Sequence, residues 1–311
     1  MKAPHRQWEW NAEIEDDLRH LMRLAIREDI DRFCDLTSFA LLSPSQTGQA
    51  VIRARAVGVV SGAIGVGVLI DEFHASCRWK AEIGDGDSCQ PDDVIGRLEG
   101  SARDLLAIER SLLNYLSHLS GIASLTRKFV EAVEGTSAVI LDTRKTVPGW
   151  RRLAKYAIRC GGGTNHRTGL FDAILIKDNH LAALAEDRGG DSSIADAVAS
   201  ARRKADRMAS ESGLPSPIPI EIEIDELAQL EAALQAEPDM ILLDNFALEQ
   251  LTAAVAARNE NHPQIQLEAS GGVQLDTVLA IAMTGVDRIS VGQLTHSAPA
   301  LDLAVDWDWR V

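Results

Sequence analysis

Short apolar segments alternate with amphipathic ones through the second half of the chain. Helical spacing recurs around 150–160, 193–212, 226–236, 247–259 and 273–284. Six apolar runs are predicted strands: AVILD (138–142), DAILIKD (172–178), IPIEIEI (218–224), DMILLD (239–244), IQLEAS (265–270) and DRISVG (287–292). Strands that alternate with helices in this way indicate a parallel α/β sheet, open or closed.

Polar and small residues stand at the C-terminal ends of these strands. The ends read Asp142-Thr143-Arg144-Lys145, Lys177-Asp178, Glu223, Asp244-Asn245, Ser270-Gly271-Gly272 and Gly292. In a (β/α) barrel such ends meet at one mouth, where the chemistry takes place. We therefore expect an α/β barrel with a separate N-terminal domain in front of it.

The first part of the chain has a different pattern. Helical spacing runs over 14–28 and again over 102–133, where Ser120-Gly121 predicts a break. Segments 50–57 and 94–100 read as strands. The tail LDLAVDWDW (301–309) alternates apolar and acidic residues, which predicts one more strand, packed outside the barrel.

Composition narrows the possible functions. A length of 311 residues allows two domains, and a net charge of −15 argues against a nucleic-acid partner. The four cysteines form neither a metal motif nor a disulfide framework. The N-terminus lacks the apolar region of a signal peptide, and the longest uncharged run, 56–70, is too short to cross a bilayer. We expect a cytoplasmic protein with no membrane partner.

Charge reverses locally between residues 144 and 177. This segment holds eight Lys or Arg and one acid, Asp172. A solvated helix face explains the basic residues of 151–159. It does not explain Arg144, Lys145, Arg167 and Lys177, which lie at strand ends or beside glycine turns. We interpret these four as an anion site, because Arg and Lys bind carboxylate and phosphate groups.

Three glycine segments differ in what they indicate. GGG (161–163) is typical of a helix C-cap followed by a turn. ASGG (269–272) and ISVG (289–292) end strands, and ASGG is predicted to open the next helix, where main-chain N–H groups bind phosphate. A tight turn without a ligand is the alternative.

Two acids and one histidine complete the candidates. Glu223 and Asp244 end neighbouring strands, which suggests Mg²⁺ carried in by a phosphorylated substrate. Pairing with Lys145 and Lys177 is the alternative, and both can hold. His166 could be a general base, a hydrogen-bond donor or a structural contact.

Several of these motifs together resemble one family. ERSLLNYLSHLSGIAS (109–124), LDTRKTVPG (141–149), KYAIRCGGGTNHRTGLFDAILIKDNH (155–180), ILLDN (241–245), EASGGV (268–273) and ISVG (289–292) are similar to quinolinate phosphoribosyltransferase (decarboxylating), also called nicotinate-nucleotide pyrophosphorylase. The similarity runs from about residue 14 to the end, in consistent order.

The resemblance implies an activity and a fold. Such enzymes join quinolinate to 5-phosphoribosyl-1-pyrophosphate (PRPP), releasing pyrophosphate and CO₂ and giving nicotinate mononucleotide, a precursor of NAD. The implied fold is an N-terminal α/β sandwich, here 1–119 completed by 296–311, plus an incomplete α/β barrel, here 120–295. Also implied is a homodimer with an active site shared across the interface, which could assemble further.

The resemblance also implies roles for single residues. Quinolinate would be held by Arg144, His166, Arg167 and Lys177, with Arg110 reaching in from the partner chain. PRPP and its Mg²⁺ would be held by Lys145, Glu223 and Asp244, and a phosphate by Ser270, Gly271, Gly272 and Gly292. Of these, Lys145, Lys177, Glu223 and Asp244 would be catalytic. Mg²⁺ is the only expected cofactor, and no organic cofactor is expected.

One segment departs from the family pattern, and other readings remain. EDIDRFCDLTS (28–38) has Asp31, Phe33 and Cys34 where family members usually carry glycines, so the resemblance does not predict the shape of that loop.

A related phosphoribosyl-type enzyme of the same fold is one alternative function. A Schiff-base lyase using Lys177 is another. A sensor that only binds pyridine carboxylates is a third.

Overall fold

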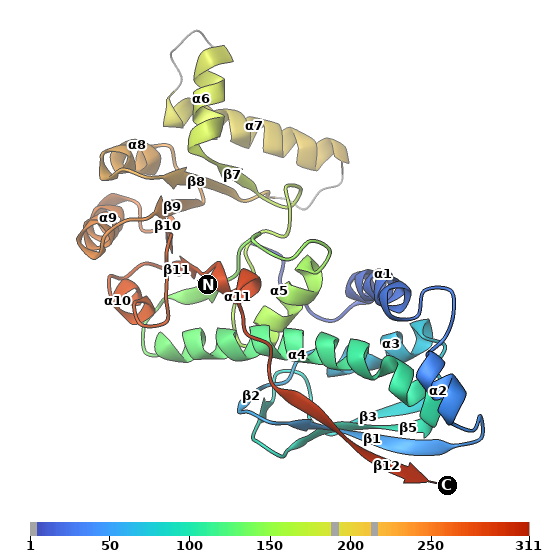
Figure 1. Ribbon diagram of the computed structural model, residues 1–311. Coiled ribbons are helices and arrows are strands. Elements are labelled where there is room, and N and C mark those ends of the chain that lie inside the picture. Colours follow the sequence, from blue (N-terminus) through green and yellow to red (C-terminus); the bar gives the residue numbers. More distant parts are fainter. Residues whose placement is uncertain (1–4, 188–192, 213–216, 311) are drawn as a thin grey trace. The chain divides into compact units, whose positions relative to one another are not determined.

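The computed structural model describes residues 5–187, 193–212 and 217–310, and it divides into two compact units (Figure 1). The parallel-sheet unit comprises Met1–Gln7, Lys128–Arg144 and Thr164–Gly292. The antiparallel-sheet unit comprises Trp8–Arg127, Lys145–Gly163 and Gln293–Val311. The domain limits expected from the sequence stay a prediction.

The parallel-sheet unit contains every strand that the apolar runs predict. Its strands are β6 (Val139–Leu141), β7 (Ile174–Ile176), β8 (Ile220–Ile224), β9 (Met240–Asp244), β10 (Gln266–Ser270) and β11 (Arg288–Ser290). They pair in the order β6-β11-β10-β9-β8-β7, and every pairing is parallel. Chain order is therefore kept around the sheet, and among the strands of the described residues no pairing joins β6 to β7. The sheet is an incomplete barrel that is open between these two strands.

Helices follow the strands of this sheet. They are α6 (Asp178–Asp187), α7 (Ile194–Ser212), the 3₁₀ turn η2 (Leu227–Gln229) with α8 (Leu230–Gln235), α9 (Leu248–Asn261) and α10 (Val278–Ala282). Ile220, Ile222 and Ile224 of β8 are fully or almost fully buried, as expected for the strand face that packs against helices. The alternate positions, Glu221 and Glu223, therefore face the inside of the barrel.

Strand register places polar side chains of the inner face at common levels. Glu223 pairs with Leu242, Leu242 with Glu268, and Glu268 with Arg288. One level further toward the C-terminal ends, Asp244 pairs with Ser270. Parallel pairing thus brings charged residues that are far apart in the sequence together on the inner face of the sheet.

The antiparallel-sheet unit holds a four-stranded sheet. Its strands are β1 (Thr47–Ala54), β3 (Cys77–Ala81), β5 (Val94–Ser101) and β12 (Leu303–Arg310), in the order β12-β1-β5-β3. The predicted C-terminal strand is thus confirmed, and it lies antiparallel to β1. Two short strands, β2 (Gly58–Val59) and β4 (Ser88–Cys89), pair with each other in a separate antiparallel sheet. The helices are α1 (Ala12–Asp29), α2 (Leu36–Leu41), η1 (Ala63–Gly65), α3 (Val66–Glu72), α5 (Arg151–Cys160), α11 (Gln293–His296) and most of α4 (Ala102–Ala132).

The long helix α4 does not break at Ser120-Gly121, so that prediction was wrong. A side chain at residue 121 would place its Cβ 2.1 Å from the carbonyl oxygen of Pro299. Ser120 Oγ accepts a hydrogen bond from the main-chain N–H of Ser61 at 3.0 Å. Gly121 is therefore explained by close approach of another segment, and it causes no interruption.

The loop that departs from the family pattern has a defined shape. Asp31 adopts φ 52°, a left-handed conformation that glycine adopts more readily. The side chain of Asp35 accepts hydrogen bonds from the main-chain N–H groups of Thr37 and Ser38 and so caps α2. A cavity of about 550 Å³ lies beside this loop, lined partly by Phe33 and Phe39.

None of the helices in the described part of the chain is both long and apolar enough to span a membrane.

Candidate functional site

The segment after the GGG turn lies along the open edge of the barrel. Gly161 is the C-cap of α5, which confirms the turn reading of these glycines. Thr164 then donates its main-chain N–H to the carbonyl of Ile140 at 2.8 Å and forms a parallel bridge with Leu141. The chain therefore runs beside β6 where a further strand would close the barrel.

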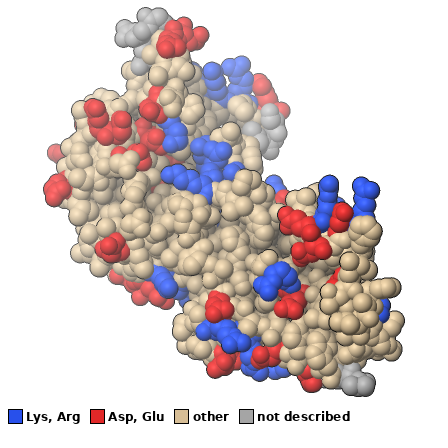
Figure 2. All heavy atoms as spheres, in the orientation of Figure 1, with Lys and Arg blue, Asp and Glu red and all other residues tan. Residues whose placement is uncertain are grey.

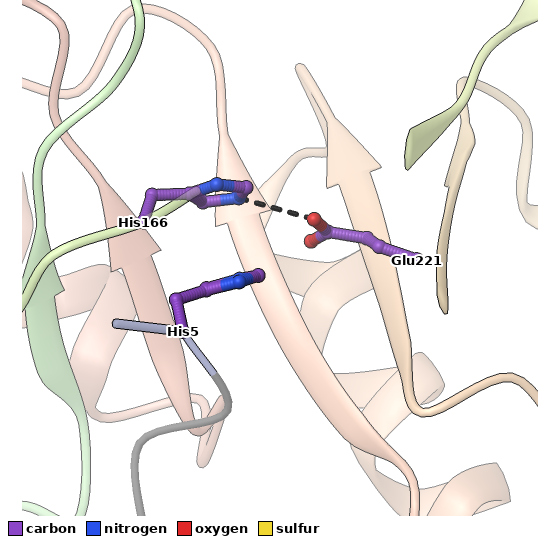
Figure 3. A group of neighbouring side chains, drawn as sticks. All are labelled: His5, His166 and Glu221. Carbon is purple, nitrogen blue, oxygen red and sulfur yellow. Dashed lines mark ion pairs between the residues drawn. The ribbon is translucent and has the colours of Figure 1, made fainter. Parts of the chain in front are cut away.

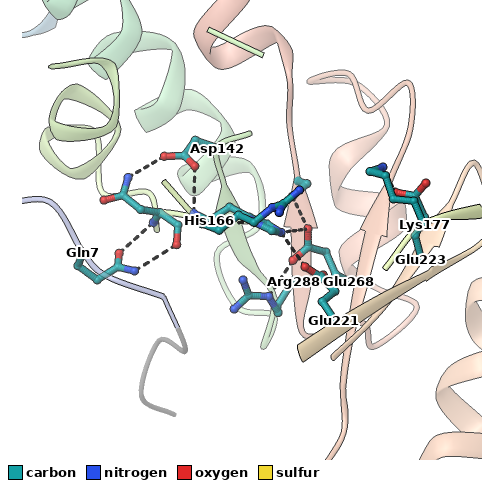
Figure 4. Close-up of polar contacts among 11 residues, drawn as sticks. Gln7, Asp142, His166, Lys177, Glu221, Glu223, Glu268 and Arg288 are labelled. Carbon is teal, nitrogen blue, oxygen red and sulfur yellow. Dashed lines mark hydrogen bonds and ion pairs between the residues drawn. The ribbon is translucent and has the colours of Figure 1, made fainter. Parts of the chain in front are cut away.

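Asp142 and Gln7, both labelled in Figure 4, hold the next residue of this segment, Asn165. Asp142 accepts hydrogen bonds from Asn165 Nδ2 at 2.7 Å and from the main-chain N–H of His166 at 3.0 Å. Gln7 accepts from the main-chain N–H of Asn165 at 2.9 Å and donates to its carbonyl at 3.2 Å. Asp142 and Asn165 are fully buried, so these bonds replace water for groups that could not be left unpaired.

The ring of His166 faces two buried carboxylates. Nε2 lies 3.0 Å from Glu221 Oε2 and 3.3 Å from Glu268 Oε1. Nδ1 accepts a hydrogen bond from the main-chain N–H of Arg167 at 2.7 Å. This bond needs the lone pair of Nδ1, so the ring proton lies on Nε2, where it faces the two carboxylates.

Glu268 is bonded on both carboxylate oxygens. Arg288 donates from Nε to Oε2 at 2.8 Å, and Ser290 donates from Oγ to Oε1. Arg288 is 2 % exposed and Glu268 is 0 % exposed, so the pair lies inside the barrel and not at its rim. Two buried carboxylates, Glu221 and Glu268, need two cations for balance, and Arg288 supplies one.

These charges set the proton affinity of His166. Burial acts to lower its pKa, but Glu268 and then Glu221 outweigh burial and raise the pKa to about 10. In return, the pKa of Glu268 is held below its usual range: burial acts to raise it, but His166 and Arg288 lower it. A second proton on the ring would enter at Nδ1 and displace the amide of Arg167. The hydrogen bond at Nδ1 therefore opposes the effect of the two carboxylates on the pKa of His166.

His5, His166 and Glu221 bring their ligand atoms within 4.8 Å of one another, a spacing that a metal ion could use (Figure 3). The two imidazole rings are stacked, with centroids 4.6 Å apart and planes inclined by 22°. Imidazole lone pairs lie in the ring plane, so nearly parallel rings do not aim at one ion. His166 Nε2 is also directed at Glu221 itself. This cluster is therefore a packed ion-pair network and does not fit a metal centre.

Arg167 is one of two neighbouring arginines in this unit. It is 7 % exposed, and burial followed by the charge of Arg144 lowers its pKa, while Glu221, Asp172 and Glu223 act in the opposite direction. Repulsion between two guanidinium groups is relieved by a bound anion. Figure 2 shows basic side chains gathered over β7 and the loop before it, in a chain of net charge −15. The predicted anion site at Arg144 and Arg167 therefore has a physical basis.

Lys177 follows β7 directly and forms an ion pair with Glu223 on the inner face of β8. The side chains are 40 % and 16 % exposed. Asp244, at the end of β9, accepts a hydrogen bond from Asn245 Nδ2 at 2.7 Å and stands level with Ser270. The predicted pairing of Glu223 with Lys177 is confirmed.

The ASGG segment differs from its prediction in one respect. No helix opens at Gly272, because α10 begins only at Val278 and has five residues. Gly271 and Gly272 instead form a turn with φ of 98° and 58°. A Cβ at Gly271 would lie 2.2 Å from Asn245 Oδ1. Any phosphate here would meet the main-chain N–H groups of a turn, not a helix N-terminus.

The remaining predicted residues are distributed over both units. Gly292 ends the parallel-sheet unit, two residues after β11. Lys145 and Arg110 belong to the antiparallel-sheet unit, where Lys145 accepts a hydrogen bond from Thr295 Oγ1 on its carbonyl at 2.8 Å. Arg110 is exposed on α4. Their roles, like those of the other site residues, stay predictions.

The sequence did not identify the buried part of the site. The residues that were missed are Gln7, Asp142 as an anchor, Glu221, Glu268, Arg288 and Ser290. Most stand inside short apolar strands, at alternate positions. A charged residue in the middle of a buried strand is itself an available signal, because such a residue needs a partner.

A barrel-type sheet with cations and acids at its C-terminal ends defines an enzyme that handles anionic substrates. Comparison with known proteins narrows this class. The family described as "Quinolinate phosphoribosyl transferase, C-terminal domain" matches residues 122–306, and the corresponding N-terminal domain family matches residues 35–120. The chain belongs to the quinolinate phosphoribosyltransferase family, so it is an enzyme and a pentosyltransferase.

Individual relatives agree over almost the whole chain. A nicotinate-nucleotide pyrophosphorylase [carboxylating] of Mycobacterium leprae is 40 % identical, covering 94 % of this chain and 97 % of its own. A probable nicotinate-nucleotide pyrophosphorylase of Bacillus subtilis is also 40 % identical, covering 93 % of each chain. The solved nicotinate-nucleotide pyrophosphorylase of Francisella tularensis superposes with a TM-score of 0.85 at 33 % identity, covering 98 % of this chain and 100 % of its own. These names support conversion of quinolinate to nicotinate mononucleotide in NAD biosynthesis, and the predicted family, fold and reaction are confirmed.

Proposed function

We propose that this chain carries out the reaction with the charged residues that follow the strands of the parallel sheet. The pyridine nitrogen of quinolinate attacks the anomeric carbon of PRPP, forming the N-glycosidic bond as pyrophosphate leaves. The bond from the ring to the 2-carboxyl carbon then breaks, CO₂ departs, and a proton takes its place. The nitrogen is already a nucleophile, so the first step needs no catalytic base.

Arg144, Arg167 and Lys177 would hold the quinolinate carboxylates. Support comes from the mutual repulsion of the two arginines and from the position of Lys177 at a strand end. His166 belongs to the same site, but both of its ring nitrogens face protein groups. We therefore assign His166 mainly to holding Arg167 in place, which revises its expected role as a direct ligand.

PRPP would occupy the neighbouring strand ends. Lys145, Glu223 and Asp244 would contact it, and the turn of Ser270, Gly271 and Gly272 with Gly292 would seat a phosphate. The two carboxylates fit Mg²⁺, because they are hard oxygen ligands on adjacent strands, Glu223 one residue before the end of β8 and Asp244 at the end of β9. When bound with PRPP, Mg²⁺ would stabilise the charge of the departing pyrophosphate. The protein residues would position the two anions.

A homodimer and a cytoplasmic location are further parts of this proposal. Arg110 is exposed on α4, so it is available to contact a second copy. It would then reach the partner's quinolinate. Removing it as Arg110→Ala should weaken quinolinate binding, and mixing this variant with an Arg167→Ala variant should restore part of the activity if sites are shared.

The observation that carries the proposal is the cationic site within a chain of this family. The test is release of pyrophosphate and CO₂ from quinolinate, PRPP and Mg²⁺, with each component omitted in turn. Nicotinate, which lacks the 2-carboxylate, should give no CO₂. Absence of product at saturating substrates would overturn the proposal.

The Schiff-base alternative fits the geometry poorly. A lysine nucleophile needs its amine free to attack a carbonyl carbon, whereas Lys177 Nζ is engaged in an ion pair with Glu223. Borohydride treatment in the presence of a carbonyl substrate should therefore leave Lys177 unmodified. The intact pair of acids Glu223 and Asp244 also disfavours a sensor that only binds pyridine carboxylates.

A further inference from the structure

Glu268 is the point at which several buried contacts meet. It is fully buried at the middle of β10, and it touches His166, Arg288 and Ser290. Arg288 and Ser290 come from the adjacent strand β11, so they hold the carboxylate from the sheet side. The orientation of this carboxylate is therefore fixed before any ligand arrives.

The contacts continue from Glu268 to an expected ligand residue. His166 Nε2 faces Glu268 at 3.3 Å, and the opposite side of the ring, Nδ1, accepts the main-chain N–H of Arg167 at 2.7 Å. A ring that is fixed at one nitrogen fixes the amide bonded at the other. The backbone of Arg167 is thus tied through His166 to the carboxylate.

The rest of the segment is anchored independently on both sides of this link. Asp142 and Gln7 hold Asn165, and Asp172 accepts the main-chain N–H groups of Thr168 at 2.7 Å and Gly169 at 3.0 Å. Arg167 lies between these anchors, and its main-chain N–H donates to His166 Nδ1. Glu268 therefore acts, through His166, on the residue that lies between the two anchored stretches.

We propose that Glu268 is a positioning residue for quinolinate: through His166 it sets the place of Arg167, and it touches neither substrate. This inference rests on the proposed function. Glu221 also faces His166 Nε2, at 3.0 Å, but within the described part of the chain no hydrogen bond to a sheet residue ties its orientation, so Glu268 carries the fixed end of the link.

The first test is Glu268→Gln, which keeps the shape and an oxygen for Arg288 or Ser290 but removes the charge. Direct binding of quinolinate without PRPP, measured by titration calorimetry, should weaken by about tenfold to a hundredfold, the usual effect of losing a supporting contact. The KM for PRPP should change by less than about twofold. Glu231→Gln is the matched control, since Glu231 is an exposed carboxylate on α8 of the same unit, and it should bind like wild type.

A double-mutant cycle separates positioning from general damage. His166→Asn and Glu268→Gln should be strongly non-additive, so that the double variant binds quinolinate no more weakly than His166→Asn alone. Additive losses, or equal losses for quinolinate and PRPP, would overturn the inference. Melting temperatures of all variants show whether the fold is kept, and if Glu268→Gln does not fold, Ser290→Ala tests the same link with a smaller change. Wild-type enzyme without activity would instead overturn the proposed function, so the two failures are distinguishable.

Discussion

Lys177 and Glu223 are joined by an ion pair across two adjacent parallel strands, β7 and β8. The two residues are assigned to different substrates in the proposed function, quinolinate for Lys177 and PRPP with Mg²⁺ for Glu223. Each of the two charges therefore neutralises the other. We expect binding of either substrate to loosen this pair, which would link the two halves of the site.

Glu223→Gln should separate binding from turnover. Lys177 then loses its internal partner, so quinolinate binding should be unchanged or up to about tenfold tighter, because competition from Glu223 is gone. Turnover should fall by about a hundredfold or more, since the carboxylate for Mg²⁺ and PRPP is lost. Calorimetric binding of quinolinate and steady-state kcat measure the two effects. Clearly weaker quinolinate binding would contradict the competition.

Arg167→Ala should abolish turnover while the protein stays folded. Arg167 is almost buried and lies close to the charge of Arg144, so its charge is unfavourable without a ligand. Removing it should leave the melting temperature unchanged or higher, with kcat/KM for quinolinate down by at least about a hundredfold. Near-normal kinetics would refute the role of Arg167, and a collapsed melting temperature would show a structural role instead.

The strands could be predicted from the sequence because each is a short apolar run with polar residues at one end. The position of 138–142 next to 287–292 could not, since pairing of the first strand with the last depends on closure of the sheet. The cationic residues Arg144, Arg167 and Lys177 stand out because they interrupt the apolar pattern. Glu268 and Arg288 do so too, but their meaning requires the register that places them side by side. The sequence also does not show that Ser120-Gly121 contacts another segment, because Pro299 approaches from a distant part of the chain.

The dependence of stability on pH should show which protons His166 carries, because the carboxylates favour a second ring proton whereas the hydrogen bond from Arg167 needs Nδ1 unprotonated. With the carboxylates dominant, the pKa in the folded state would be raised to about 10, above the ordinary value of about 6.5 that applies when the chain unfolds. The resulting stability would be complete below about pH 6.5 and lost as the pH rises toward 10. The slope is at most about 1.4 kcal/mol per pH unit.

Other groups also titrate in this range, so the measurement is a difference between proteins. The free energy of unfolding of wild type and of His166→Asn would be compared at several values between about pH 7 and 9. The groups that face His166 are Glu221, Glu268, His5 and the amide of Arg167. Parallel profiles for the two proteins are expected, because the Arg167 amide keeps Nδ1 unprotonated. A stability difference that shrinks as the pH rises would show that the carboxylates dominate, and it would contradict the link from Glu268 to Arg167.

Two glycine substitutions should have opposite effects on stability. Gly271→Ala places a Cβ 2.2 Å from Asn245 Oδ1 at a residue with φ 98°, so it should destabilise the protein by about 1 to 3 kcal/mol. It should also raise the KM for PRPP, because this turn is assigned to phosphate binding.

Gly67→Ala is the control, since a Cβ there meets nothing within 4 Å and the residue lies in α3. It should stabilise the protein by up to about 1 kcal/mol and leave both KM values unchanged. Denaturant unfolding and steady-state kinetics measure both, and an unchanged KM for PRPP in folded Gly271→Ala would remove this turn from the phosphate site.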